Sequence, residues 1–287
     1  MDGAGASQLR DSLSCGSANR GALYLAAELA RFGRGYTIPE PWWSRDRRFG
    51  TDELVDVIKR AAASVADTHP GATLGVADLS RAQGGAISGH RSHQSGRDAD
   101  LIFYALDAQG QPFQPDNHMA FYSRSGRAYY AKAPKYDRTI TERYFDLPRN
   151  WALVKALMTD DRARVEHMFV SSRIRRWLLR YAETIEEDPA LIKRASRILK
   201  RPTSTGGHND HMHIRVSCTE DDISQGRCKN SVERGRRKFY SRVRCPTRPK
   251  NETGPSVEPE TRPAETRPAE TRPTPPANSL STRQIPG

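Results

Sequence analysis

The stretch SGHRSHQSGRDADL at residues 88–101, together with GGHNDHMHI at residues 206–214, decides how this chain folds. Five of the eight histidines lie in these two segments, and both segments also carry aspartates. Isolated histidines are usually surface or satisfied core residues, whereas two such clusters predict that the fold brings both segments to one site. The candidate site residues are His90, His93, Asp98, Asp100, His208, Asp210, His211 and His213.

The second cluster predicts a β-strand over residues 211–217. Apolar and polar residues alternate along it, which places the two sets on opposite faces. His211 and His213 are two residues apart, so both side chains point to the same face and can share a site. The apolar set is Met212, Ile214 and Val216, and the polar set is His211, His213, Arg215 and Ser217.

The first cluster lies on a loop rich in glycine and serine. A predicted strand at residues 73–79 precedes this loop, and the apolar run at residues 100–106 predicts a buried strand after it. Gly96 permits the turn between His93 on the loop and Asp100 at the start of the second strand. Loops held between strands are a usual place for catalytic residues.

Helical patterns occupy much of the remaining chain. Thr51 caps an amphipathic helix, further helices are expected at residues 150–158 and 172–185, and Asp188-Pro189 opens another. Residues 109–144 are polar and tyrosine-rich, and we treat them as irregular with room for a hairpin. This order of elements predicts an α+β domain, in which a small antiparallel sheet carries the site and helices flank it.

The composition changes at Cys245, after which the chain contains the repeat ETRPAETRPAETRP. We expect a domain at residues 1–245 and a disordered tail at residues 246–287. The tail holds six basic and five acidic residues, so +11 of the net charge of +12 belongs to the domain. Nine basic residues lie between residues 229 and 250. Such a stretch suggests an anionic partner, and charge alone does not choose among nucleic acid, lipid headgroups and wall polymers.

Four cysteines are present and none forms a CxxC pair. An even number fits two disulfides in an oxidising compartment. We favour Cys218 with Cys228 and Cys15 with Cys245, although four cysteines allow three pairings. The opening residues MDGAGASQLRDS lack an apolar stretch of the signal-peptide type, and no segment is long enough to span a membrane.

Imidazole and carboxylate donors together are typical of zinc, and a catalytic zinc site keeps one position for water. One histidine and one aspartate from the first segment, with one histidine from the second, would supply three protein ligands. Zinc lowers the pKa of its water from about 16 to about 7, which suits amide hydrolysis at neutral pH.

The spacing in SHQSGRDAD and the HMH triplet resemble the zinc motifs of the lysostaphin-type, D-Ala-D-Ala-carboxypeptidase and Hedgehog-fold metallopeptidases. Within that group, SGHRSHQSGRDADL and GHNDHMHIRVSC are most similar to the penicillin-insensitive murein endopeptidases. The resemblance runs from about Cys15 to Cys228 and stops short of the repeats.

The resemblance implies a role for each candidate residue. His93, Asp100 and His213 match the zinc ligands, and His90 matches a further histidine that lines the metal site. His211 matches the general base or oxyanion-stabilising residue. His208 matches a second histidine beside His211. Asp98 and Asp210 would orient imidazole rings through their N–H groups. Arg215 would bind a carboxylate of the substrate.

The sequence therefore predicts a zinc-dependent endopeptidase that acts on the cross-linked stem peptides of peptidoglycan, with no nucleic-acid partner. We expect it in the periplasm or secreted, with a trimmed N-terminus. Two alternatives stay open. HNDH at residues 208–211 on a basic chain is compatible with a His-Asn-His metal nuclease, and a zinc-stabilised wall-binding module without catalysis would keep the same ligands.

Overall fold

The computed structural model describes residues 12–129, 142–202, 208–230 and Cys245. All of them belong to the first of two compact units, Met1–Pro246, and the predicted tail lies outside the described residues. The described strands are β1 Leu13–Ser17, β2 Arg20–Tyr24, β3 Ala27–Glu28, β4 Phe32–Gly33, β5 Tyr36–Thr37, β6 Phe49–Gly50, β7 Leu74–Val76, β8 Asp98–Ile102, β9 Ala105–Asp107, β10 Pro112–Phe113, β11 Phe121–Tyr122, β12 Ala128–Tyr129, β13 Arg143–Phe145, β14 Val165–Phe169, β15 Leu199–Lys200 and β16 His211–Val216. The described helices are α1 Glu40–Trp43, α2 Asp52–Thr68, α3 Leu147–Thr159, α4 Ser172–Thr184, α5 Pro189–Ile198 and α6 Glu220–Ser224.

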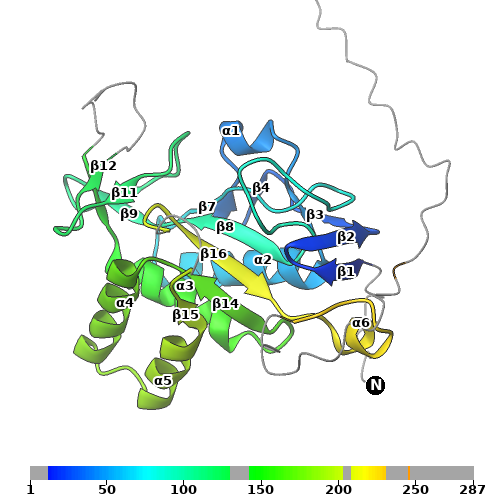
Figure 1. Ribbon diagram of the computed structural model, residues 1–287. Helices are drawn as coiled ribbons and strands as arrows, with labels where there is room; N and C mark the ends of the chain where they lie inside the picture. Colours follow the sequence, from blue (N-terminus) through cyan, green and yellow to red (C-terminus); the bar gives the residue numbers. More distant parts are fainter. Residues whose placement is uncertain (1–11, 130–141, 203–207, 231–244, 246–287) are drawn as a thin grey trace, which may run out of the picture. The chain divides into compact units, whose positions relative to one another are not determined.

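A seven-stranded sheet in the order β15-β14-β16-β8-β7-β5-β4 forms the centre of the fold (Figure 1). Its four middle strands, from β14 to β7, pair antiparallel. Strand β15 pairs parallel with β14 and β5 pairs parallel with β7, whereas the edge strand β4 pairs antiparallel with β5. The sheet is therefore larger and more mixed than the small antiparallel sheet we expected. The predicted α+β class is confirmed.

Strand β16 lies in the middle of this sheet and shows the alternation that the sequence predicted. Met212 and Ile214 have no exposed surface and belong to the main hydrophobic core. The core also contains the apolar face of α2, which passes behind β8 and β16 in Figure 1. Burial of the apolar face therefore fixes the direction of the histidine face, because the side-chain period of a strand is two.

The predicted helices form, and side-chain caps set where they begin. The Thr51 side chain accepts a hydrogen bond from the Leu54 backbone N–H and starts α2. Helix α3 begins at Leu147, three residues before the predicted start, because the Asp146 side chain accepts from the Arg149 backbone N–H. Asp188 and Pro189 open α5 as expected.

Two expectations about strands were wrong. The apolar run at residues 100–106 is not one strand, because β8 already begins at Asp98 and ends at Ile102, and β9 pairs in a different sheet. Strand β14 was not predicted at all, because Glu166 and His167 interrupt its apolar pattern. Residues 109–144 contain the short antiparallel pair β11–β12, and residues 130–141 lie outside the description.

The disulfides join Cys15 to Cys245 and Cys218 to Cys228, so the favoured pairing is confirmed. Cys15 lies on the hairpin formed by β1 and β2. The turn of this hairpin reaches the histidine loop, because the Gln94 backbone N–H donates to the Ala18 carbonyl over 3.1 Å. Within the part of the chain described here, none of the helices is both long and apolar enough to cross a membrane.

Candidate metal centre

The two histidine segments meet where β8 pairs with β16. In this antiparallel register His213 lies opposite Asp100, and Arg215 lies opposite Asp98. A cavity of about 290 Å³ opens over the pair. The predicted residues that line it are His90, Asp100, His208, His211, His213 and Arg215, and the walls also include Asn19, Gly89, Arg91, Ser92, Phe169 and Pro202.

His93, from the first segment, lies completely buried beneath the cavity in a left-handed backbone conformation with φ +66°. Its Nδ1 lies 2.9 Å from the carbonyl oxygen of Leu79, which can only accept a hydrogen bond. Nδ1 therefore carries the proton, and Nε2 presents its lone pair to the centre. The carbonyl of His93 in turn accepts a hydrogen bond from the Ser80 hydroxyl.

The segment that follows β7 positions the candidate metal ligands of the first motif, His93 and Asp100. The Asp100 backbone N–H donates to the Asp78 carbonyl over 3.0 Å, and the Ala77 N–H donates to the Asp100 carbonyl over 2.8 Å. Because Leu79 orients His93, one short segment fixes both an imidazole and a carboxylate. Gly96 then closes the loop with φ +73°, as the sequence predicted.

His213, from the second segment, lies between two carboxylates. Its Nε2 is 2.8 Å from Asp98 Oδ1, and its Nδ1 is 2.9 Å from Asp100 Oδ1. When the Nε2–H donates to Asp98, the neutral ring presents the Nδ1 lone pair to the centre. Asp98 also accepts from Arg215 Nε over 2.7 Å and, through Oδ2, from the His93 backbone N–H over 3.3 Å.

Three acceptor atoms converge on the floor of this cavity. His93 Nε2 lies 3.2 Å from His213 Nδ1 and 3.4 Å from Asp100 Oδ1, and the last two atoms are 2.9 Å apart. Donors at about 2.0–2.1 Å from a tetrahedral zinc ion are ~3.3 Å apart. The three atoms are therefore spaced like one face of such a tetrahedron, and a metal ion or a proton could lie between them.

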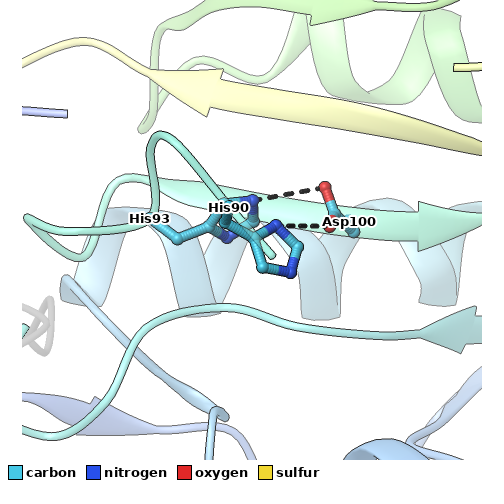
Figure 2. A group of neighbouring side chains, drawn as sticks. All are labelled: His90, His93 and Asp100. Atoms are coloured by element: carbon cyan, nitrogen blue, oxygen red, sulfur yellow. Dashed lines mark ion pairs between the residues drawn. The ribbon is translucent and has the colours of Figure 1, made fainter. Parts of the chain in front are cut away.

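An overlapping set of donors consists of His90, His93 and Asp100, whose ligand atoms all lie within 4.8 Å of one another. Figure 2 shows His90 and His93 side by side on the loop, both facing Asp100 on β8. His90 Nδ1 lies 3.5 Å from Asp100 Oδ2. Both sets contain His93 and Asp100, and they differ in whether the third donor comes from the loop or from β16. These residues could hold a metal ion.

Two further histidines stand at the rim of the centre. His211 Nε2 lies 3.5 Å from Asp100 Oδ1, and its Nδ1 is 2.9 Å from Asp210 Oδ1. The ring of His208 lies 4.7 Å from that of His211, between centroids. Asp210 thus orients His211 with Nε2 toward the centre, which places a second ring nitrogen beside Asp100.

The electrostatics of the cluster favour positive charge at its centre. Burial alone would lower the pKa of His213, but hydrogen bonds to Asp100 and Asp98 raise it to about 9. Burial would also lower the pKa of His211, and the Asp100 charge and the Asp210 hydrogen bond raise it instead. Burial would raise the pKa of Asp98, whereas Arg215 and His213 hold it well below its ordinary value.

All eight histidine and aspartate candidates therefore belong to one cluster. Each either lines the cavity or contacts a residue that lines it. Sequence reasoning missed the cavity walls contributed by Asn19 and Phe169, which lie on a hairpin turn and on the unpredicted strand β14. It also missed Asp78, whose carboxylate accepts from His90 Nε2 over 3.0 Å. Asp78 falls within the strand predicted at residues 73–79, and no local pattern marks it.

A family model described as penicillin-insensitive murein endopeptidase matches residues 14–264. The chain belongs to the penicillin-insensitive murein endopeptidase family. The match covers both histidine segments, and it continues past Cys228 into the first ETRPA repeat, farther than the resemblance in the sequence had suggested. No curated protein matches the chain significantly. Membership in this murein endopeptidase family implies a peptidase that acts on peptidoglycan.

Proposed function

We propose that this murein endopeptidase is zinc-dependent and hydrolyses the peptide cross-links of peptidoglycan. The observation that carries the proposal is the triangle of His93 Nε2, Asp100 Oδ1 and His213 Nδ1, with sides of 2.9–3.4 Å. These three atoms would hold the metal from below, and the cavity above them would receive the scissile amide. His90 Nδ1 would serve as an additional donor on the loop side.

Zinc bound at this triangle would act as a Lewis acid toward the amide carbonyl and toward water in the cavity. The remaining chemistry falls to the protein. Cleavage of a C–N bond requires that a proton leaves the attacking water and that one reaches the departing amine. His211 Nε2 faces the centre and is oriented by Asp210, so we assign that transfer to His211.

His208 would assist from the same side of the cavity. Its ring lies 4.7 Å from that of His211 and 5.8 Å from that of His213, between centroids. A protonated imidazole here would stabilise the negative charge that develops on the carbonyl oxygen.

Arg215 remains a candidate for binding a free carboxylate of the stem peptide. It lines the cavity, and its Nε donates to Asp98. A substrate carboxylate that entered the cavity would meet the positive charge of this guanidinium. The periplasm or the exterior of the cell is the proposed location, supported by the peptidoglycan substrate of the family and by two disulfides.

The His-Asn-His nuclease hypothesis is set aside. It rested on HNDH at residues 208–211 and on the basic charge, and it gave no role to the first segment. His208 and His211 share one cavity with His90 and Asp100 of that segment. The wall-binding module is the remaining alternative. It would need the metal ligands but neither His208 nor His211 at the rim, so their position beside the donors supports catalysis.

The test is incubation of the purified protein with cross-linked muropeptide dimers, with and without a chelator, followed by mass spectrometry. We expect dimers to become monomers, the chelator to stop the reaction and zinc to restore it. The product masses identify which bond is cut. Intact dimers with a protein that holds about one zinc would favour the binding module, and intact dimers without bound metal would overturn the metal centre itself.

A further inference from the structure

Asp78 is a buried carboxylate behind the metal centre, and its side chain is 3% exposed. Its Oδ2 lies 3.0 Å from His90 Nε2, 3.0 Å from Arg45 Nη1 and 3.2 Å from Arg47 Nη1. The two arginines come from the segment between α1 and β6, which is distant in sequence from both histidine motifs. One carboxylate oxygen thus connects a cavity histidine to two cations.

This contact determines which nitrogen of His90 carries a proton. Beside two guanidinium groups the Asp78 carboxylate is ionised and can only accept, so His90 Nε2 must donate. In the neutral ring Nδ1 then carries the lone pair, and it lies 3.5 Å from Asp100 Oδ2 on the side of the candidate metal ligands. The His90 ring also packs edge-on against that of His93, with centroids 4.4 Å apart.

The arginines keep Asp78 in place. Arg47 Nη1 donates to the Ser88 carbonyl over 3.2 Å and so joins the carboxylate to the start of the histidine loop. The Arg45 guanidinium lies 5.5 Å from the centroid of the Trp42 ring. Rotation of Asp78 away from His90 would separate its charge from both cations in a buried environment, which is costly.

We propose that Asp78 is a positioning residue of the metal centre, which fixes the orientation and tautomer of His90 so that Nδ1 is presented beside Asp100. This inference rests on the proposed zinc-dependent function. Asp78 accepts a hydrogen bond from Nε2 of His90 on the loop, just as Asp98 accepts one from Nε2 of His213 on the strand. Partners of this kind commonly change metal affinity about 10–100-fold when they are altered.

The experiment compares the full chain with Asp78→Asn. Nitrogen-15 NMR of the histidine side chains, recorded without metal and assigned with His90→Gln, reports the tautomer. We expect the Nε2–H tautomer of His90 in the natural chain and a shift toward Nδ1–H in Asp78→Asn. Zinc affinity, measured by chelator competition, should fall about 10–100-fold, and the visible spectrum of the cobalt-loaded protein should change.

Asp160→Asn is the matched control, because the Asp160 side chain, 7% exposed, pairs with Arg60 over 2.7 and 2.9 Å and lies outside the lining of the metal-site cavity. It should lower stability without changing the His90 tautomer or the zinc affinity. An Asp78→Asn protein that loses stability in the same way but keeps the natural tautomer and affinity would overturn the inference. A natural chain that binds no zinc would overturn the proposed function as well, so the two failures are distinguishable.

Arg45→Gln provides a second variant if Asp78→Asn does not fold, because the Arg45 side chain is 43% exposed. Removal of one of the two cations behind Asp78 should weaken zinc binding about threefold, in keeping with a partly exposed ion pair. An unchanged zinc affinity and an unchanged His90 tautomer in this variant would contradict the proposed series of contacts from Arg45 through Asp78 to His90.

Discussion

The loop motif and the strand motif bring their donors to the same point by different physical means. His93 lies on a glycine-rich loop with φ +66° and is fixed by backbone groups, namely the Leu79 carbonyl and its own N–H and carbonyl. His213 lies in the regular strand β16 and is fixed by two carboxylates. The loop conformation carries local backbone strain at His93, whereas regular pairing with the neighbouring strands sets the geometry of β16.

Asp98 joins the two halves. Its Oδ1 accepts from His213 and Arg215 of the strand motif, and its Oδ2 accepts from the His93 backbone N–H of the loop motif. Asp98 is fully buried, and its two oxygens hold the loop motif and the strand motif in their relative position. The candidate metal centre therefore depends on contacts between the motifs as much as on its ligands.

The largest effect is expected from His213→Ala, which tests whether the loop motif can hold metal without the strand motif. His213→Ala leaves His93 and Asp100 without the strand donor, and we expect loss of bound zinc and of muropeptide cleavage, measured by metal analysis and mass spectrometry. His118→Ala, at a side chain 63% exposed, should keep both. Stoichiometric zinc in His213→Ala would show instead that His90, His93 and Asp100 form the complete site.

The next effect separates metal binding from proton transfer within the strand motif. His211→Ala should retain zinc, because His211 stands outside the donor triangle, but the cleavage rate should fall by about 10²–10⁴. Rates of dimer cleavage and the zinc content of the same preparation are compared. Loss of zinc in this variant would make His211 a ligand.

A smaller effect is expected where the two motifs are coupled. Asp98→Asn keeps an acceptor for His213 but removes the charge opposite Arg215 and places an amide N–H against the His93 N–H. Zinc affinity by chelator competition should fall about 10–100-fold, while the protein stays folded by circular dichroism. Natural affinity in Asp98→Asn would mean that the motifs hold their positions independently.

The smallest effect measures the strain of the loop. Gly96→Ala places a Cβ 2.6 Å from Leu23 Cδ1 at φ +73°, and urea unfolding should show a loss of about 2 kcal/mol. Gly110→Ala has a similar φ of +76° with no atom within 4 Å, so it reports the backbone strain alone and should cost about 1 kcal/mol. Equal losses would show that the contact with Leu23 contributes nothing.

Much of the centre could be predicted from the sequence because its signals are local. The alternation in HMHIRV fixed the face shared by His211 and His213, since the period of a strand does not depend on its partners. The Thr51 cap and the Asp188-Pro189 start needed only a few neighbouring residues. Strand β14 escaped prediction because Glu166 and His167, although both buried, interrupt its apolar pattern.

The sequence by itself indicated that the two histidine segments meet, the α+β class and the family, because these follow from motif spacing and from the order of the elements. The tertiary structure decided which atoms meet. His213 and Asp98 are 115 residues apart, and only the pairing of β16 with β8 turns Nε2 toward Asp98 and Nδ1 toward the donors. Asp78 beside His90, and the arginines behind it, likewise depend on contacts between separate elements, which no local periodicity encodes.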